Sequence, residues 1–182
     1  MEQNLKLIAI IPPQEVSDEV RSLQEYIAHQ WGPKHALRTP PHITIIPPIA
    51  LNSAQTGWLF GMAYAMAGTL TPFQLELNGF DFFKPRVVYI RPIVSEPLQE
   101  LHEIWQSALL SKMPHILDTY PQRPYHPHLT LAHKDVTRPQ FDQMMLYFKN
   151  KPFHMHFTVD RFCILTHRDH GWEMEREYYF QN

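Results

Sequence analysis

Two short segments of this sequence share one form, in which a histidine is followed two residues later by a threonine. They read Pro41-His42-Ile43-Thr44-Ile45 and Pro127-His128-Leu129-Thr130-Leu131. In both, a proline precedes the histidine, and aliphatic residues alternate with the polar ones. Because alternate side chains of a β-strand point to the same face, each segment would present an imidazole and a hydroxyl together and bury its aliphatic residues.

Such a pair of segments is suited to breaking a phosphodiester bond. Without a metal ion, that reaction needs a base to activate the attacking oxygen and an acid to protonate the leaving oxygen, and two imidazoles can do both. The hydroxyls of Thr44 and Thr130 can donate hydrogen bonds to the non-bridging phosphate oxygens. If the segments face each other across a cleft, His42 and His128 lie on opposite sides of the phosphorus atom, as in-line displacement requires.

The elements around the two segments must position them. Apolar runs and alternation predict strands, and helical spacing of apolar residues predicts helices. We expect strands at 5–11, 42–46, 73–83, 87–93, 126–132, 153–165 and 172–180, and helices at 17–31, 53–67, 96–110 and 139–148. Ser17 is expected to be the N-cap of the first helix, and the prolines on both sides of residues 42–46 should keep that strand short.

This order of elements repeats a similar unit twice, and each unit holds one of the two segments. It predicts an α+β fold with mostly antiparallel sheets flanked by helices. No linker is evident between the units, so we expect residues 1–182 to form a single bilobed domain.

The two segments give the sequence a resemblance to the 2H phosphoesterase superfamily, which includes the 2′-5′ RNA ligase-like proteins and the cyclic phosphodiesterases. The resemblance rests on His42-Ile43-Thr44-Ile45 and His128-Leu129-Thr130-Leu131 and on the order of strands and helices around them. It implies a bilobed, pseudo-twofold fold with both motifs in a central cleft. It also implies metal-independent action on 2′,3′-cyclic phosphates or 2′-5′-linked nucleotide and RNA ends. The histidines would be the catalytic acid–base pair and the threonines would bind the substrate phosphate.

Three further residues are candidates for accessory roles. Lys134 follows the second motif where such proteins often have an arginine, and it would supply a point charge in place of a planar fork. His126 has the same strand parity as His128, so it could face the cleft. Tyr125 lies at a segment end that could border the cleft, where an aromatic ring could stack on a base.

Composition limits the partners that the chain can have. The formal net charge is −2, from 16 basic and 18 acidic residues, whereas proteins that grip a long duplex usually carry a basic excess. We therefore expect a nucleotide or RNA terminus as substrate, and no duplex DNA. The sequence has no apolar run of membrane-spanning length and no recognisable secretory signal, and its single cysteine suits a reducing compartment. We expect a cytoplasmic monomer.

Two other functions fit parts of the pattern. One is a module that binds a nucleotide or RNA end without chemistry, although such a module would have no need of both histidines and both threonines. The other is a metal hydrolase that uses the His-x-His pairs at 126–128 and 154–156. No acidic or cysteine ligand has a suitable spacing beside these pairs, so we expect no metal and no cofactor.

Overall fold

The computed structural model describes residues 4–118, 124–169 and 171–181. Its elements, in chain order, are β1 (Asn4–Ile10), α1 (Gln14–Trp31), a short 3₁₀ helix (His35–Arg38), β2 (Ile43–Leu51), α2 (Ser53–Ala67), β3 (Phe73–Phe83), β4 (Val87–Pro92), α3 (Glu96–Lys112), β5 (Leu129–Ala132), α4 (Arg138–Phe148), β6 (His154–Val159), β7 (Arg161–Arg168) and β8 (Gly171–Tyr179). The expected α+β class is confirmed. None of the helices in these ranges has the length and apolarity that crossing a membrane requires.

The strands form an eight-stranded sheet in the order β6-β3-β4-β5-β2-β1-β7-β8, and the neighbouring pairs are antiparallel. The two strands that follow the motif histidines, β5 and β2, are neighbours at its centre. We call the strands β2, β1, β7 and β8 the β1 half, and β5, β4, β3 and β6 the β4 half. We call β2 and β5, which follow the motif histidines, the motif strands. The order is symmetric about their junction, because β1 leads through α1 to β2 and β4 leads through α3 to β5. This arrangement confirms the expected bilobed, pseudo-twofold organisation.

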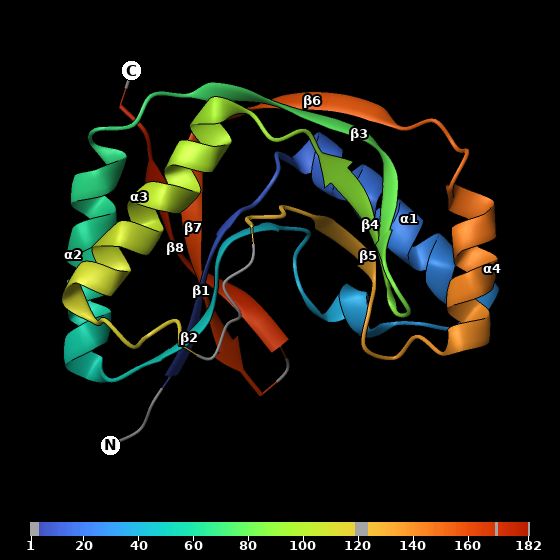
Figure 1. The fold of residues 1–182 in the computed structure, drawn as a ribbon, viewed down its shortest axis with the longest axis horizontal. Coiled ribbons are helices and arrows are strands. Elements are labelled where there is room, and N and C mark those ends of the chain that lie inside the picture. Colours follow the sequence, from blue (N-terminus) through green and yellow to red (C-terminus); the bar gives the residue numbers. More distant parts are fainter. Residues whose placement is uncertain (1–3, 119–123, 170, 182) are drawn as a thin grey trace.

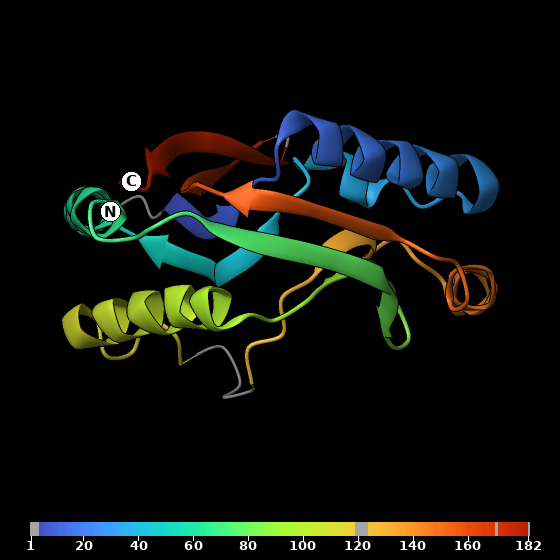
Figure 2. The ribbon, with the colours of Figure 1, turned by 90° about the horizontal axis from the view of Figure 1, so that it is seen from above.

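The helices cover the sheet in two pairs. In Figure 1, α2 and α3 lie beside the β1 half, whereas α1 and α4 lie beside the β4 half. Figure 2 shows α1 and α3 on opposite faces of the sheet. Helix α1 packs against β5, and α3 packs against β2. The helices thus cross between the halves. Helix α1 follows β1 but supports β5 of the β4 half, and α3 follows β4 but supports β2 of the β1 half.

Helix α3 packs through one apolar stripe. Its positions Leu98, Leu101, Trp105 and Leu109 follow helical spacing and are each no more than 1% exposed. Full burial of one large apolar side chain stabilises a fold by about 1.5–3 kcal/mol, so this stripe anchors α3 firmly beside β2. The expected stripe is confirmed.

Two expectations about the first half were wrong. Helix α1 begins at Gln14, after Pro13 in the N-cap position, and Ser17 lies inside the helix, where its hydroxyl donates to the Pro12 carbonyl at 2.9 Å. Strand β2 is not a short strand, because it continues through the two prolines to Leu51. The pairing with β1 shifts register between Ile46 and Ile49, and this irregularity accommodates residues that lack a backbone N–H.

Two boundaries in the second half also differ. The apolar run 153–165 is divided at Asp160 into β6, which pairs with β3 in the β4 half, and β7, which pairs with β1 in the β1 half. One run of apolar residues therefore serves two parts of the sheet, which periodicity alone does not reveal. Strand β5 begins at Leu129, three residues later than expected, so His126 lies before the strand.

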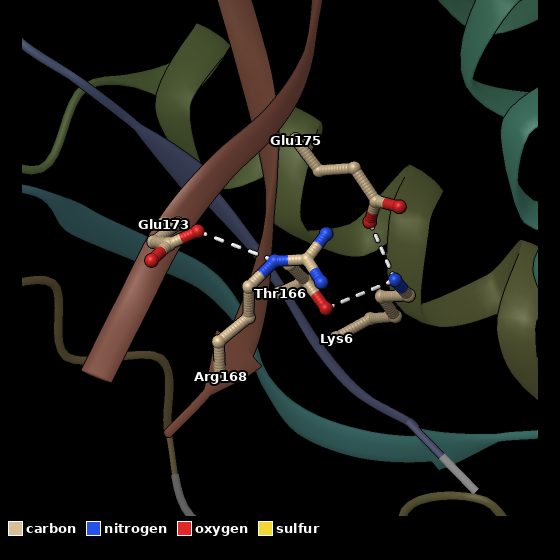
Figure 3. A network of polar contacts seen from close by, with 5 residues as sticks. All are labelled: Lys6, Thr166, Arg168, Glu173 and Glu175. Atoms are coloured by element: carbon tan, nitrogen blue, oxygen red, sulfur yellow. Dashed lines mark hydrogen bonds and ion pairs between the residues drawn. The ribbon is translucent and has the colours of Figure 1, made fainter. Parts of the chain in front are cut away.

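A buried polar network fastens the strands of the β1 half. Figure 3 shows Lys6 of β1 between Thr166 of β7 and Glu175 of β8, with Arg168 and Glu173 paired nearby. The Lys6 ammonium donates to the Thr166 hydroxyl at 3.0 Å and forms an ion pair with Glu175. Because Lys6 is only 4% exposed, these two partners take the place of water around its ammonium group.

Candidate active site

The β2–β5 junction brings the two motifs to one place. Ile43 and Leu129, each the residue after a motif histidine, are Cα partners across these strands. Both aliphatic residues are fully buried, whereas the neighbouring histidine and threonine of each motif are half-buried. The expected alternation of polar and apolar faces is therefore present, although both histidines lie one residue before the strand itself.

The two motif imidazoles are held in the same way. Nδ1 of His42 bonds the carbonyl of Pro40 at 2.8 Å, and Nδ1 of His128 bonds the carbonyl of His126 at 2.9 Å. A carbonyl oxygen can only accept, so Nδ1 carries the proton in each ring. In the neutral imidazole, Nε2 is then the nitrogen that can accept a proton.

A cavity of about 240 Å³ is lined by all four motif side chains. Its other polar and aromatic lining residues are Gln24, His35, Thr39, His133, Lys134 and Trp172. None of the described residues that line it is acidic, and four of them are histidines. A small space with many proton donors and no carboxylate is suited to holding an anion.

Burial controls the protonation of these imidazoles. It lowers the pKa of His42 and of His128, while the hydrogen bond to the backbone carbonyl opposes the effect in each case. The charge of His128 lowers the pKa of His42 further. Burial, with help from His35 and Lys134, lowers the pKa of His133 to about 4. Burial thus favours the neutral form of these imidazoles, whereas a bound anion would favour their protonated form.

A second cavity, of about 870 Å³, adjoins the first on the side of α3. Thr44 and His128 line both cavities, so the two spaces meet at the motifs. The larger cavity is lined by strand β2, by His102, Gln106 and Leu110 of α3, and by residues 117, 118 and 124–126. It is large enough for a nucleoside beside the motif residues.

Each motif strand is held through the carbonyl of its threonine. The Gln24 amide of α1 donates to the Thr130 carbonyl at 2.9 Å, and the Tyr125 hydroxyl donates to the Thr44 carbonyl at 3.0 Å. The Tyr125 ring stacks on His102, with centroids 4.1 Å apart and planes within 4°. His102 in turn bonds the Ile45 carbonyl through Nδ1 at 2.8 Å.

Gln24 was not predicted as a site residue, although the sequence contains a signal for it. It lies between Val20 and Ile27 at helical spacing, and it is 2% exposed. A glutamine on the apolar face of a helix must find a hydrogen-bond partner in the core. His35 was missed too, and it left no comparable signal, because only the 3₁₀ turn brings it beside His133, with ring centroids 4.8 Å apart.

The three accessory candidates divide between the cavities. Lys134 lines the smaller cavity, whereas Tyr125 and His126 line the larger one. His126 is also bonded through Nε2 to the Tyr89 hydroxyl at 2.9 Å, which ties the segment before β5 to β4. Across residues 4–118, 124–169 and 171–181, no group of three or more His, Cys, Asp or Glu side chains is arranged to hold a metal ion.

The chain is similar in sequence to a known family and to proteins of known name. The family described as the 2′-5′ RNA ligase superfamily matches residues 12–171. A protein of Geobacillus kaustophilus named as a phosphoesterase is 26% identical over 166 residues, which cover 90% of this chain and 88% of that protein. An RNA 2′,3′-cyclic phosphodiesterase of Bacillus subtilis is 34% identical over 97 residues, or 51% of each chain.

Solved structures share the fold. A Thermus thermophilus protein superposes with a TM-score of 0.75 at 18% identity, covering 97% of each chain. Escherichia coli LigT complexed with 3′-AMP gives a TM-score of 0.67, also at 18% identity, covering all of both chains.

Proposed function

The chain belongs to the 2′-5′ RNA ligase superfamily of 2H phosphoesterases, and we propose that it hydrolyses 2′,3′-cyclic phosphates or 2′-5′ linkages at nucleotide or RNA ends without a metal ion. One observation carries the proposal. Two imidazoles from distant parts of the chain, His42 and His128, line one small cavity, and each is bonded to the backbone through Nδ1. Each can therefore accept or donate a proton at Nε2.

For a 2′,3′-cyclic phosphate, the proposed step transfers two protons. One imidazole takes a proton from water as the water oxygen forms a bond to phosphorus. The bond between phosphorus and one ribose oxygen breaks on the opposite side, and the second imidazole, protonated at the start, gives its proton to that oxygen. The product is a phosphate monoester beside a free ribose hydroxyl, and the two histidines have exchanged protonation states.

The remaining polar groups of the smaller cavity would bind the phosphate. The hydroxyls of Thr44 and Thr130 are proposed to donate to its non-bridging oxygens, where charge increases during the reaction. Lys134 would add a positive charge at the same cavity. The name of the B. subtilis relative supports a cyclic phosphate as the first substrate to test.

Turnover of 2′,3′-cyclic nucleotides and 2′-5′-linked dinucleotides, with and without chelator, tests this proposal. We expect hydrolysis that the chelator does not inhibit, and a loss on the order of 10²–10⁴-fold in kcat for His42→Ala and for His128→Ala. His29→Ala, at an exposed site of α1 outside both cavities, is the matched control. Wild-type rates in both motif variants would sink the proposal, and tight binding without product would indicate a binding module.

A further inference from the structure

A basic groove continues from the smaller cavity across the surface. It has a volume of about 500 Å³ and is lined by Pro85, Arg86, Lys134, Asp135, Val136, Thr137 and Arg138. Lys134 lines both the groove and the smaller cavity, so the two spaces meet at this residue. The groove is formed by the turn between β3 and β4 together with the segment that leads from β5 into α4.

The charges in this groove are available to an anion. Arg86, Lys134 and Arg138 are exposed, and within the described ranges no side-chain hydrogen bond or ion pair engages Arg86 or Lys134. Arg138 pairs with Asp142 through Nε alone. The one carboxylate that lines the groove, Asp135, already accepts from the backbone amides of residues 34 and 35 at 2.7 and 2.9 Å. In a chain of net charge −2, this is a local basic surface.

The backbone holds Lys134 at the meeting point. Its φ is 58°, in the left-handed region that residues other than glycine seldom adopt. A hydrogen bond of 2.7 Å from the Asp135 amide to the His133 carbonyl closes this tight turn. Helix α4 then begins at Arg138, and its N-terminus adds partial positive charge to the same groove.

Three hollow features thus adjoin one another: the larger and smaller cavities share Thr44 and His128, and the smaller cavity and the groove share Lys134. A terminal ribonucleotide with a 2′,3′-cyclic phosphate also has three parts that leave its ribose in different directions. The cyclic phosphate lies on C2′ and C3′, the base on C1′, and the connection to the preceding nucleotide on C4′ through C5′. A mononucleotide without a 5′-phosphate would leave the groove empty.

We infer that this groove is a binding site for the backbone phosphates that precede the terminus of a single-stranded RNA substrate, whose cyclic phosphate would lie in the smaller cavity and whose terminal base would lie in the larger one. This inference rests on the proposed function. Lys134 and Arg86 contact the backbone phosphates nearest the terminus, and Arg138 contacts the next. Flexible single strands fit the groove, because recognition there is by charge along the backbone.

The test compares kcat/KM for a single-stranded RNA of about six nucleotides ending in a 2′,3′-cyclic phosphate with kcat/KM for the cyclic mononucleotide. We expect the RNA to be the better substrate by on the order of tenfold at low salt, and the advantage to fall as salt rises. The double variant Arg86→Gln/Arg138→Gln should lose most of this ratio. Lys149→Gln, at the opposite end of α4 from Arg138, should keep it.

Binding provides a second measurement that needs no turnover. The same RNA ending in a 3′-phosphate should bind the wild-type protein and the Lys149→Gln control equally, and the double variant about tenfold more weakly. An equal RNA-to-mononucleotide ratio in wild type and double variant, with equal binding, would overturn the inference and leave the proposed function standing. If neither substrate is hydrolysed, the proposed function fails. The binding comparison then still tests whether the groove binds the RNA backbone.

Discussion

Ile43 of β2 and Leu129 of β5 lie directly opposite each other, and each immediately follows a motif histidine. Residues 86 positions apart in the sequence are thereby fixed at one level of the sheet. A strand shift of one residue would turn the histidine and threonine of that motif toward the core. The buried aliphatic residues on both strands oppose such a shift, so the apolar face of the motifs sets the position of the polar one.

The pH dependence of turnover follows from the lowered pKa values of His42 and His128. One histidine must be neutral and the other protonated, and a cyclic phosphodiester does not change its charge near neutrality. Because burial holds both pKa values below 6.5, kcat/KM should fall about tenfold per pH unit as pH rises above neutrality. Steady-state rates on a 2′,3′-cyclic nucleotide from pH 5 to 9 test this. A rate that climbs across that range would contradict it.

Removing the Gln24 amide should lower turnover by displacing Thr130 of the second motif. Gln24→Leu loses the donor to the Thr130 carbonyl, and we expect kcat to fall about tenfold with a smaller change in KM, since Thr130 would be misplaced rather than absent. The unsatisfied carbonyl should also cost about 1–3 kcal/mol of stability. Gln14→Leu, at the exposed start of α1, is the control. Unchanged kcat in a destabilised Gln24 variant would show a structural role only.

His133 should make the fold sensitive to acid. Its pKa is lowered to about 4 in the folded protein, below the ordinary value of 6.5, so the unfolded chain takes up a proton first as pH falls. Stability from the neutral ring is present above pH 6.5 and is lost as pH falls toward 4, by about 2 kcal/mol at pH 5. Urea unfolding at pH 7 and pH 5 should show a smaller loss in His133→Gln. An identical loss in both proteins would refute this assignment.

The Lys6 network should contribute stability and leave chemistry alone. Glu175→Gln leaves a buried ammonium without its counter-charge, which we expect to cost about 3 kcal/mol or more in the free energy of unfolding. Glu173→Gln breaks the exposed pair with Arg168 and should cost less than about 1 kcal/mol. Denaturant titrations measure both variants, while kcat on the cyclic nucleotide should equal the wild-type value. Equal stability of the two variants would argue against a buried, charged Lys6.

Much of this fold is predictable from local pattern, and the exceptions have clear causes. The stripe from Leu98 to Leu109 follows from helical spacing, and the end of α2 follows from Gly68; both signals lie within or beside one element. The division at Asp160 was not predictable, because it depends on which distant strands β6 and β7 pair with. The site also has a part that is predictable from the sequence and a part that is not. The chemistry of the two motifs is predictable from their own residues. The position of His35 in the smaller cavity, and the groove beside Arg86, depend on contacts between segments far apart in the chain.

The division at Asp160 also sets an order of events during synthesis. The strands of the β4 half are contiguous in the chain, from β3 to β6, but β1 has one neighbour in β2 and the other in β7, which begins at Arg161. While the ribosome makes the residues between β1 and β7, the edge of β1 that pairs with β7 is uncovered. An unprotected edge is a template for pairing with other chains. That edge of β1 is therefore open to pairing with another chain until β7 has been made.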